Sequence, residues 1–391
     1  MPLRRRARPI GDRSRPVQPA PRPRPTSRPA RRPSTRRVAG GGLSFVLASL
    51  LALACAPAGG APAPAAPAAP ASAPSAPSAA APAAPTAAAP EHLKVIYSSL
   101  SGSYMPLWIA VDQGLFRQQG LDPELVLIES GTTATQTLVA GEAPLANVGA
   151  AAVIGAMVGG FDGLYVQATV QVPPLALFTQ PNLNAPDGLR GARVGVTRFG
   201  SSTDVVGRRL LRRWDLDPER DVAMLQLGGV PELLAGLQSG AVDAAVLSDP
   251  TSLAAAKLGF RQAADGATLN IPYMHLGTVV PRGVLASRPD LIRRYLLAYQ
   301  AGLDRFFADA ALGEKVLGDY TRTDDPEILA GTYKAYAEKY ITRDVLPRPD
   351  TLATILATVS DPRAKEIAPE SLIDDTLVRE LQAEGRIPPS R

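Results

Sequence analysis

Apolar runs that suit β-strands are followed, several times along the chain, by loops rich in hydroxyl groups and then by apolar positions at helical spacing. The central example begins at residues 193–196, where alternating β-branched positions predict a strand. The polar loop of residues 197–204 follows, and Ser201 and Asp204 have the spacing of a capping box at a helix start. Free N–H groups there, together with the hydroxyl groups, could bind an anion or a polar oxygen. A plain connecting turn has the same pattern. This loop alone therefore does not distinguish a binding site from a turn, and the rest of the sequence is needed for that.

Two further copies of this pattern precede it. Residues 93–97 predict a strand, and a serine-rich loop leads to a helix whose apolar stripe includes Leu107 and Val111. Residues 121–128 predict a second strand, followed by a polar loop and a helix that runs through Leu138. Strands that alternate with helices over short connections predict an α/β fold with parallel, doubly wound sheets. Ligands of such sheets bind at the carboxyl ends of the strands.

A weak internal repeat relates two parts of this region. Residues 138–149 and residues 237–248 both read as a helix that ends at glycine, a short turn and a strand of small residues. The pattern is common among α/β proteins, and two lobes of similar build are the simplest explanation of it.

Two extended segments predict the connections between these lobes. Strands are expected at residues 174–180 and 274–280, so that two crossovers could act as a hinge about a central cleft. After residue 290 the pattern is helical to the end of the sequence, and these helices are expected to brace the first lobe. The expected domains are lobe 1 at residues 91–177, lobe 2 at residues 178–275, and the return of lobe 1 with the C-terminal helices at residues 276–391.

The pattern of the first 55 residues is typical of an export signal. Residues 1–42 carry 13 arginines and one acid, Asp12, which is a net charge of +12 against +5 for the whole chain. The remainder therefore carries −7, and the basic leader does not indicate nucleic-acid binding. Leu43 to Ala54 form an uncharged apolar run of 12 residues, long enough for a signal peptide and too short to span a bilayer.

Cys55, the only cysteine, follows this apolar run. Residues 51–55 resemble a bacterial lipobox, with Ala52 where leucine is usual, which implies cleavage before Cys55 and its lipidation. The alternative is a simple secretory signal with an incidental cysteine. Arg36-Arg37 could belong to a twin-arginine signal, so the export route, Sec or twin-arginine, stays open. Residues 56–90 are almost entirely Ala, Pro, Ser and Gly and predict a disordered tether. We therefore expect an exported domain, lipid-anchored at the outer face of the cytoplasmic membrane.

Chemistry-bearing side chains are scarce along the sequence. The only histidines are His92 and His275. No metal-ligand cluster, nucleophile elbow or phosphate loop is present in the sequence. We expect a protein that is not an enzyme and that has no catalytic residue, metal or cofactor. Trp108 and Trp214 are expected to lie in the core.

Three stretches together resemble the nitrate/sulfonate/taurine-type solute-binding proteins of ABC importers, a superfamily that also includes binders of thiamine-precursor pyrimidines. They are residues 109–122, residues 187–196 and residues 237–246. The resemblance implies a type II periplasmic-binding-protein clamshell, with two doubly wound α/β lobes, a two-strand hinge and C-terminal helices. It also implies a monomer that closes on a small polar ligand, anionic or heterocyclic, such as a sulfonate, and delivers it to an ABC permease. A ligand sensor for a membrane receptor is the alternative; a pyrimidine-synthase-like enzyme is disfavoured because the cysteine-rich motif of those synthases is absent.

The resemblance also implies which residues face the ligand, although not which ligand it is. In the first lobe and at the approach to the hinge they are Ser98, Ser99, Tyr104, Gly131, Thr132, Thr133, Gly149, Ala150 and Gln171. In the second lobe they are Phe199, Gly200, Ser201, Ser202, Thr203, Ser248 and Asp249. Tyr104 and Phe199 could instead be core residues. Asp249 either accepts a hydrogen bond from a ligand amine or caps the next helix.

Overall fold

The computed structural model describes residues 89–389. Contacts divide the chain into two units, Met1–Ala79 and Ala80–Arg391, and the description concerns the second of them. The basic leader, the lipobox with Cys55 and all but the last two residues of the predicted tether lie outside the described residues.

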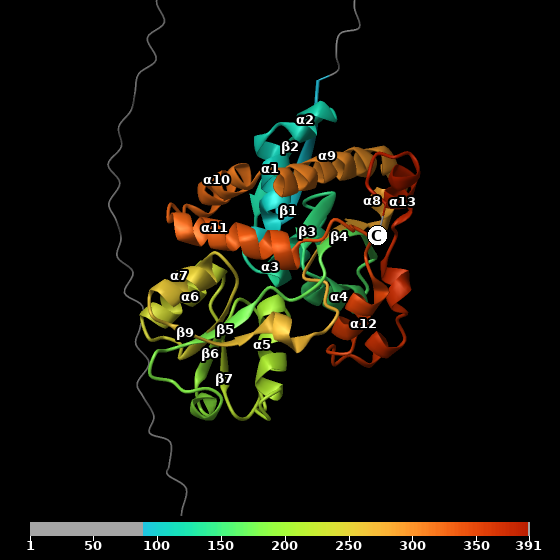
Figure 1. The fold of residues 1–391 in the computed structure, drawn as a ribbon. Coiled ribbons are helices and arrows are strands. Elements are labelled where there is room, and N and C mark those ends of the chain that lie inside the picture. The colour runs from blue at the N-terminus through green and yellow to red at the C-terminus, as the bar shows by residue number, and fades with distance from the viewer. Residues whose placement is uncertain (1–88, 390–391) are drawn as a thin grey trace, which may run out of the picture. The chain divides into compact units, whose positions relative to one another are not determined.

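One five-stranded sheet, sheet A, belongs to the first lobe (Figure 1). Its strand order is β2-β1-β3-β10-β4, with β1 parallel to both β2 and β3 and with β10 antiparallel to its two neighbours. The strands are β1 (Glu91–Tyr97), β2 (Leu121–Leu127), β3 (Leu145–Val148), β4 (Gly163–Val170) and β10 (Leu276–Pro281).

A second five-stranded sheet, sheet B, repeats this plan with the order β7-β6-β8-β5-β9. Here β5 is antiparallel to both neighbours, whereas β6 is parallel to β7 and β8. The strands are β5 (Ala176–Thr179), β6 (Arg193–Val196), β7 (Ala223–Gln226), β8 (Ala244–Leu247) and β9 (Arg261–Asp265).

The prediction of wholly parallel sheets is therefore wrong at β5 and β10, and both sheets are mixed. The reason is topological. Each of these two strands is the first that the chain enters after it crosses from the other sheet. A chain that leaves one sheet at the carboxyl ends of its strands enters the facing sheet at the carboxyl ends there, and so runs against the other strands.

Helices join successive strands in the same sequence in both lobes. The first lobe has α1 (Met105–Asp112), α2 (Leu115–Gln118), α3 (Gly131–Val139) and α4 (Ala150–Val158), and the second has α5 (Ser202–Arg212), α6 (Val230–Gln238) and α7 (Thr251–Lys257). The C-terminal helices are α8 (Arg282–Ser287), α9 (Pro289–Ala308), α10 (Ala310–Thr321), α11 (Pro326–Ala335), α12 (Pro349–Leu356) and α13 (Thr376–Ala383).

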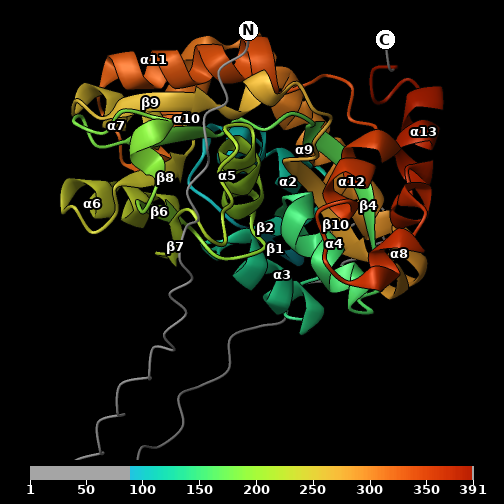
Figure 2. The same ribbon diagram turned by 90° about the horizontal axis from the view of Figure 1, so that it is seen from below.

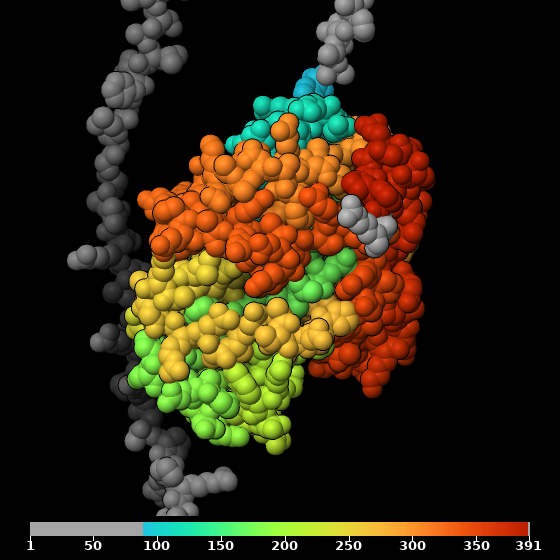
Figure 3. Space-filling view, viewed as in Figure 1, coloured from blue at the N-terminus to red at the C-terminus, as the bar shows by residue number. Residues whose placement is uncertain are grey.

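The C-terminal helices pack mainly on elements of the first lobe. They gather around sheet A, where α9 packs along α1 and α12 packs on α4 (Figures 1 and 2). Trp108 on α1 is fully buried and stacks on Tyr320 of α10, with 4.7 Å between the ring centroids. Trp214 is partly buried against the core. In the space-filling view α11 lies against the second lobe near α7, where Lys257 Nζ is 2.6 Å from Asp325 Oδ2 (Figure 3).

Two adjacent crossovers connect the sheets. One is residues 171–175, between β4 and β5, and the other is residues 270–275, before β10. The His275 N–H donates to the Val170 carbonyl at 2.8 Å, and the Tyr273 N–H donates to the Gln171 carbonyl at 3.2 Å. The crossovers therefore run side by side as a hydrogen-bonded pair. None of the helices between residues 89 and 389 is long and apolar enough to cross a lipid bilayer.

Candidate functional site

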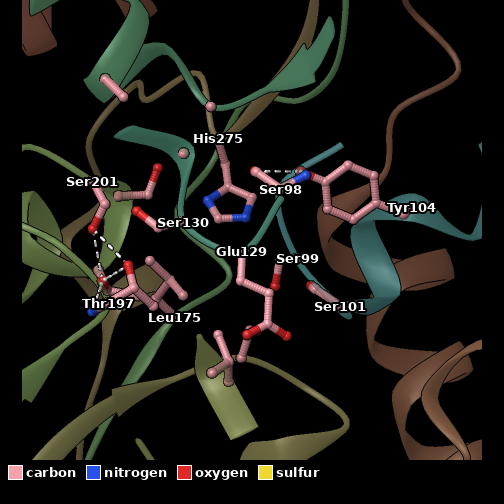
Figure 4. A pocket seen from close by; sticks show the side chains of 17 residues that line it. Ser98, Ser99, Ser101, Tyr104, Glu129, Ser130, Leu175, Thr197, Ser201 and His275 are labelled. Atoms are coloured by element: carbon pink, nitrogen blue, oxygen red, sulfur yellow. Dashed lines mark hydrogen bonds between the residues drawn. The ribbon is translucent and has the colours of Figure 1, made fainter. Parts of the chain in front are cut away.

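A cavity lies where the carboxyl ends of the strands of both sheets face each other. Its volume is about 50 Å³, several times the roughly 10–15 Å³ that one water molecule requires. Seventeen residues line it, and they come from both lobes and from the crossovers (Figure 4). They are Ser98, Ser99, Ser101, Tyr104, Glu129, Ser130, Gly131, Gly149, Ala152, Leu175, Thr197, Ser201, Ser202, Thr203, Val230, Ser248 and His275.

Four helices of eight or more residues begin at this cavity. Ser130, Gly149 and Ser201 are the N-cap residues of α3, α4 and α5, and Val230 is the first residue of α6. The first turn of each helix has N–H groups without partners inside the helix, and the helix dipole makes that end partially positive. The cavity is therefore suited to a polar ligand with at least one oxygen acceptor.

Three hydroxyl groups form a cluster at the start of α5. Thr197 Oγ1 donates to Ser201 Oγ at 2.9 Å, and Thr203 Oγ1 lies 2.9 Å from both of these oxygens. Ser201 Oγ also accepts the Asp204 N–H at 3.5 Å, which confirms the predicted cap. The Asp204 carboxylate reaches back to the N–H of Gly200, at 2.9 Å, and not to that of the cap residue. The cluster is thereby held in place beside the cavity.

Tyr104 closes the first-lobe side of the cavity. Its hydroxyl oxygen lies 2.8 Å from Ser98 Oγ and donates to the carbonyl of Asn147 at 3.2 Å. Burial raises the pKa of Tyr104 to about 12, so the phenol remains protonated at neutral pH. The side chain is both a wall of the cavity and a hydrogen-bonding group.

His275 reaches the cavity from the second crossover. Figure 4 shows its ring beside Ser98 and Ser130. Nδ1 is buried and has no hydrogen-bond partner among the described residues. Burial lowers the pKa of His275 to about 4, because the surrounding protein replaces the water that would stabilise the charged ring. The imidazole is therefore neutral at physiological pH.

The low pKa of His275 predicts a loss of stability in acid. In the unfolded chain the pKa returns to its ordinary value of 6.5, so that state binds more protons between pH 6.5 and 4. The free energy of unfolding should fall by about 3 kcal/mol over this window and level off below it. Urea unfolding at several pH values should show this loss in the wild type and its absence in His275→Gln. The control His92→Asn changes an exposed histidine and should leave the acid-side loss in place; equal profiles for the wild type and His275→Gln would contradict the prediction.

Glu129 and Ser130 lie side by side where β2 gives way to α3. Burial raises the pKa of the Glu129 carboxyl group above its usual value, and the neighbouring Glu232 raises it further. Ser130 has φ 82°, a backbone conformation that non-glycine residues seldom adopt, and its buried hydroxyl has no partner among the described residues. Strained backbone of this kind is concentrated at functional sites.

Nine of the residues that the sequence analysis selected line this cavity. They are Ser98, Ser99, Tyr104, Gly131, Gly149, Ser201, Ser202, Thr203 and Ser248. They come from the ends of β1, β2, β3, β6 and β8, so the loops chosen from the sequence do converge.

Seven of the selected residues do not line the cavity. Four of these lie in first turns and tight loops beside the cavity. Thr132 Oγ1 donates across to the Phe199 carbonyl at 3.1 Å, and Gly200 has φ 79° in the turn before α5. Ala150 is fully buried in the core, and Thr133 lies in the first turn of α3.

The other three have partners elsewhere. Gln171 Nε2 donates to the Leu346 carbonyl and its Oε1 accepts the Arg348 N–H, both at 3.0 Å. Phe199 is 44% exposed, with its ring under the Arg208 guanidinium. The Asp249 carboxylate accepts a hydrogen bond from the Ser252 hydroxyl group, and α7 begins after Pro250 without a side-chain cap, so Asp249 does not cap that helix.

Eight lining residues were not selected from the sequence. They are Ser101, Glu129, Ser130, Ala152, Leu175, Thr197, Val230 and His275. Four of them, namely Ser101, Glu129, Ser130 and Thr197, lie in the same polar loops as selected residues. Selecting every residue of each loop would therefore have included them. His275 has no local signal, because its place depends on how the second crossover packs.

The described residues contain no group of three or more His, Cys, Asp or Glu side chains that could hold a metal ion. The polar lining of the cavity is instead made of hydroxyl groups, one carboxyl group and one imidazole. Such a set binds a ligand through hydrogen bonds.

Solved structures share this architecture. The alkanesulfonate-binding protein SsuA from Xanthomonas axonopodis pv. citri, bound to MOPS, is 21% identical, with a TM-score of 0.61 over 75% of this chain and 98% of that one. The aliphatic sulphonate binding protein SsuA from Escherichia coli is 20% identical, with a TM-score of 0.56 over 74% and 91%. The nitrate-binding protein NrtA from Synechocystis PCC 6803 is 14% identical, with a TM-score of 0.62 over 76% and 91%. The predicted periplasmic-binding-protein fold is confirmed.

Sequence comparison places the chain in a family. No curated protein sequence matches it at a significant level. The sequence profile of the NMT1-like family matches residues 86–302, which is more than half of the chain and includes every residue that lines the cavity. The chain therefore belongs to the NMT1-like family.

Proposed function

We propose that this protein is the extracytoplasmic solute-binding component of an ABC importer, and not an enzyme. The observation that carries the proposal is the cavity itself, which is lined by polar groups from two lobes of the same strand order and is bounded by two paired crossovers. Among the relatives with this fold, two are named as sulfonate-binding proteins and one as a nitrate-binding protein. A small polar solute is therefore the expected cargo.

The proposed mechanism is closure of two lobes about the crossovers. Residues 91–177 with residues 276–391 form one body and residues 178–275 the other. In the open state a ligand meets the hydroxyl groups of one lobe only, and in the closed state it meets those of both. The ligand shifts the equilibrium by the difference between these contacts, so closure follows binding. The closed lobes then present one continuous surface to an ABC permease.

Export and anchoring complete the proposal. The apolar run of residues 43–54 directs the chain across the cytoplasmic membrane, and lipidation of Cys55 retains it at that membrane. The anchored protein acts as a monomer. The Ala/Pro-rich residues 56–90 link the anchor to the binding domain, so that the domain can reach the permease. Labelling with a radioactive fatty acid, lost in Cys55→Ala, tests the anchor.

The proposed function is tested by a thermal melt of the purified protein with sulfonates, nitrate, carboxylates, pyrimidines and amines. A solute at one hundred times its dissociation constant stabilises the folded state by about 2.7 kcal/mol, a resolvable rise in melting temperature. A saturable shift with one chemical class supports solute capture. No shift with any class contradicts it.

Replacing Ser201, Ser202 and Thr203 together with alanine should weaken binding of the solute found in that panel. The variant removes three hydroxyl groups of the cavity wall, each worth about 1 kcal/mol when hydrogen-bonded. The expected loss is about 2–3 kcal/mol, or roughly 30- to 150-fold in dissociation constant by titration calorimetry. The control is Ser239→Ala, an exposed serine at the end of α6. Unchanged affinity in the triple variant would remove the start of α5 from the binding site.

A further inference from the structure

The charge of the cavity is unlike that of a site for a simple anion. Among the seventeen described residues that line it there is no lysine and no arginine, whereas Glu129 contributes a carboxyl group. On α5, the Arg208 side chain is paired with Asp204 and Glu219. His275 is neutral at physiological pH because its pKa is about 4. An oxyanion here would meet hydroxyl groups and helix starts, but also a carboxyl group that is negatively charged above its raised pKa, and no cation among the lining residues.

Two carboxyl groups meet at one edge of the cavity, and they come from opposite lobes. Glu129 follows β2 in the first lobe, and Glu232 lies in the first turn of α6 in the second. The Glu232 carboxylate accepts the Gly229 N–H at 3.0 Å. A Cβ atom placed on Gly229 would lie 2.5 Å from Glu232 Oε2 and would overlap Glu129 Oε2. The two side chains therefore share one small space beside Gly229.

Such a pair is unfavourable unless a proton or a donor group lies between the oxygens, and a hydrogen bond to Glu232 accordingly helps to raise the pKa of Glu129. Glu232 is exposed at the rim, whereas Glu129 is partly buried and lines the cavity. The other titratable groups around Glu129 are Tyr97, whose own pKa is raised by burial and by the Glu129 charge, and the neutral His275. No basic group among the described residues lining the cavity offers Glu129 a donor in place of that shared proton.

An independent observation indicates that a ligand supplies it. The Ser130 hydroxyl is buried, with the residue only 3% exposed, and it has no hydrogen-bond partner among residues 89–389. His275 Nδ1 is likewise buried without a partner in the described part of the chain. Figure 4 shows Ser130, His275 and Glu129 around the same space. Buried polar groups are nearly always hydrogen-bonded, so these atoms offer hydrogen-bonding positions that a ligand in the cavity would fill.

Resting on the solute-capture function proposed above, we infer that the solute carries a nitrogen with bound hydrogens, as in an amine, an amidine or an amino-substituted heterocycle, and that Glu129 accepts its hydrogen bond. The oxygen or ring-nitrogen acceptors of the same solute face the starts of α3 and α5. Nitrate and simple sulfonates lack the donor that Glu129 requires.

Matched probes test this inference. Guanidinium and nitrate are both planar and trigonal, ethylammonium and ethanesulfonate share an alkyl chain, and 2-aminopyrimidine differs from pyrimidine by its amino group. The donor-bearing member of at least one pair should raise the melting temperature of the wild-type protein in a saturable way. Glu129→Gln should weaken that binding at least tenfold, and the control Glu142→Gln, an exposed residue of the same lobe, should leave it unchanged.

The pH dependence separates a direct contact from a structural role. Guanidinium stays charged throughout, whereas Glu129 becomes ionised as the pH rises through its raised pKa. Guanidinium binding to the wild type should therefore strengthen over that range, and Glu129→Gln should remove the dependence. Binding of nitrate or ethanesulfonate that survives Glu129→Gln would overturn the inference and leave solute capture standing. Failure of all six probes would overturn the inference, and solute capture is contradicted only if the wider panel described above also gives no shift.

Discussion

Gly149→Ala is expected to weaken ligand binding by about a hundredfold or more while each lobe keeps its fold. A Cβ atom on Gly149 would lie 2.6 Å from the His275 carbonyl oxygen and 2.6 Å from Ser202 Oγ. Gly149 belongs to the first lobe, Ser202 to the second, and His275 to a crossover. The added methyl group therefore separates the lobes at the cavity, and closure has to work against it. A penalty of about 3 kcal/mol on the closed state corresponds to this loss of affinity.

Titration calorimetry with the solute found in the panel measures that loss, and small-angle scattering of the ligand-free variant should show a larger radius of gyration. The matched control is Gly155→Ala on the same helix, where an added Cβ atom has no neighbour within 4 Å. That control should keep its affinity and stabilise α4 by up to about 1 kcal/mol, because alanine is the better helix former. Wild-type affinity in Gly149→Ala would show that closure does not depend on this contact.

Trp108→Ala is expected to lower the free energy of unfolding by about 3–5 kcal/mol, the largest effect on stability. The indole is fully buried, stacks on Tyr320 at an interplanar angle of 9°, and lies 6.0 Å from the Tyr104 ring between centroids. Its removal leaves a cavity between α1 and α10 that these aromatic neighbours cannot fill without leaving their own contacts.

Denaturant unfolding followed by circular dichroism measures this change. The control is Leu258→Ala, since Leu258 is 54% exposed and should alter stability by less than about 0.5 kcal/mol. Because Tyr104 also lines the ligand cavity, Trp108→Ala should weaken binding in addition. A loss of stability below about 1 kcal/mol would mean that the helices close over the space.

Local patterns were sufficient for most of the fold that positions the site. The strand predicted at residues 193–196 is β6, and Ser201 caps the helix that follows. The internal repeat is also real in three dimensions, because β3 and β8 hold the third place in their sheets. Gly149 and Ser248, which the repeat aligns, both line the cavity. Alternation, helical spacing and capping act over a few residues, so they can be read from the sequence alone.

The sequence alone thus determined the α/β class and the polar loops at the strand ends. Only the tertiary structure showed that β5 and β10 run antiparallel to their neighbours. It also showed that Gln171 and Asp249 form hydrogen bonds away from the cavity, and that Glu129 and His275 line it. These features depend on contacts between residues far apart in the chain. Burial and partner geometry, and not local preference, set where such a side chain lies and whether it is charged.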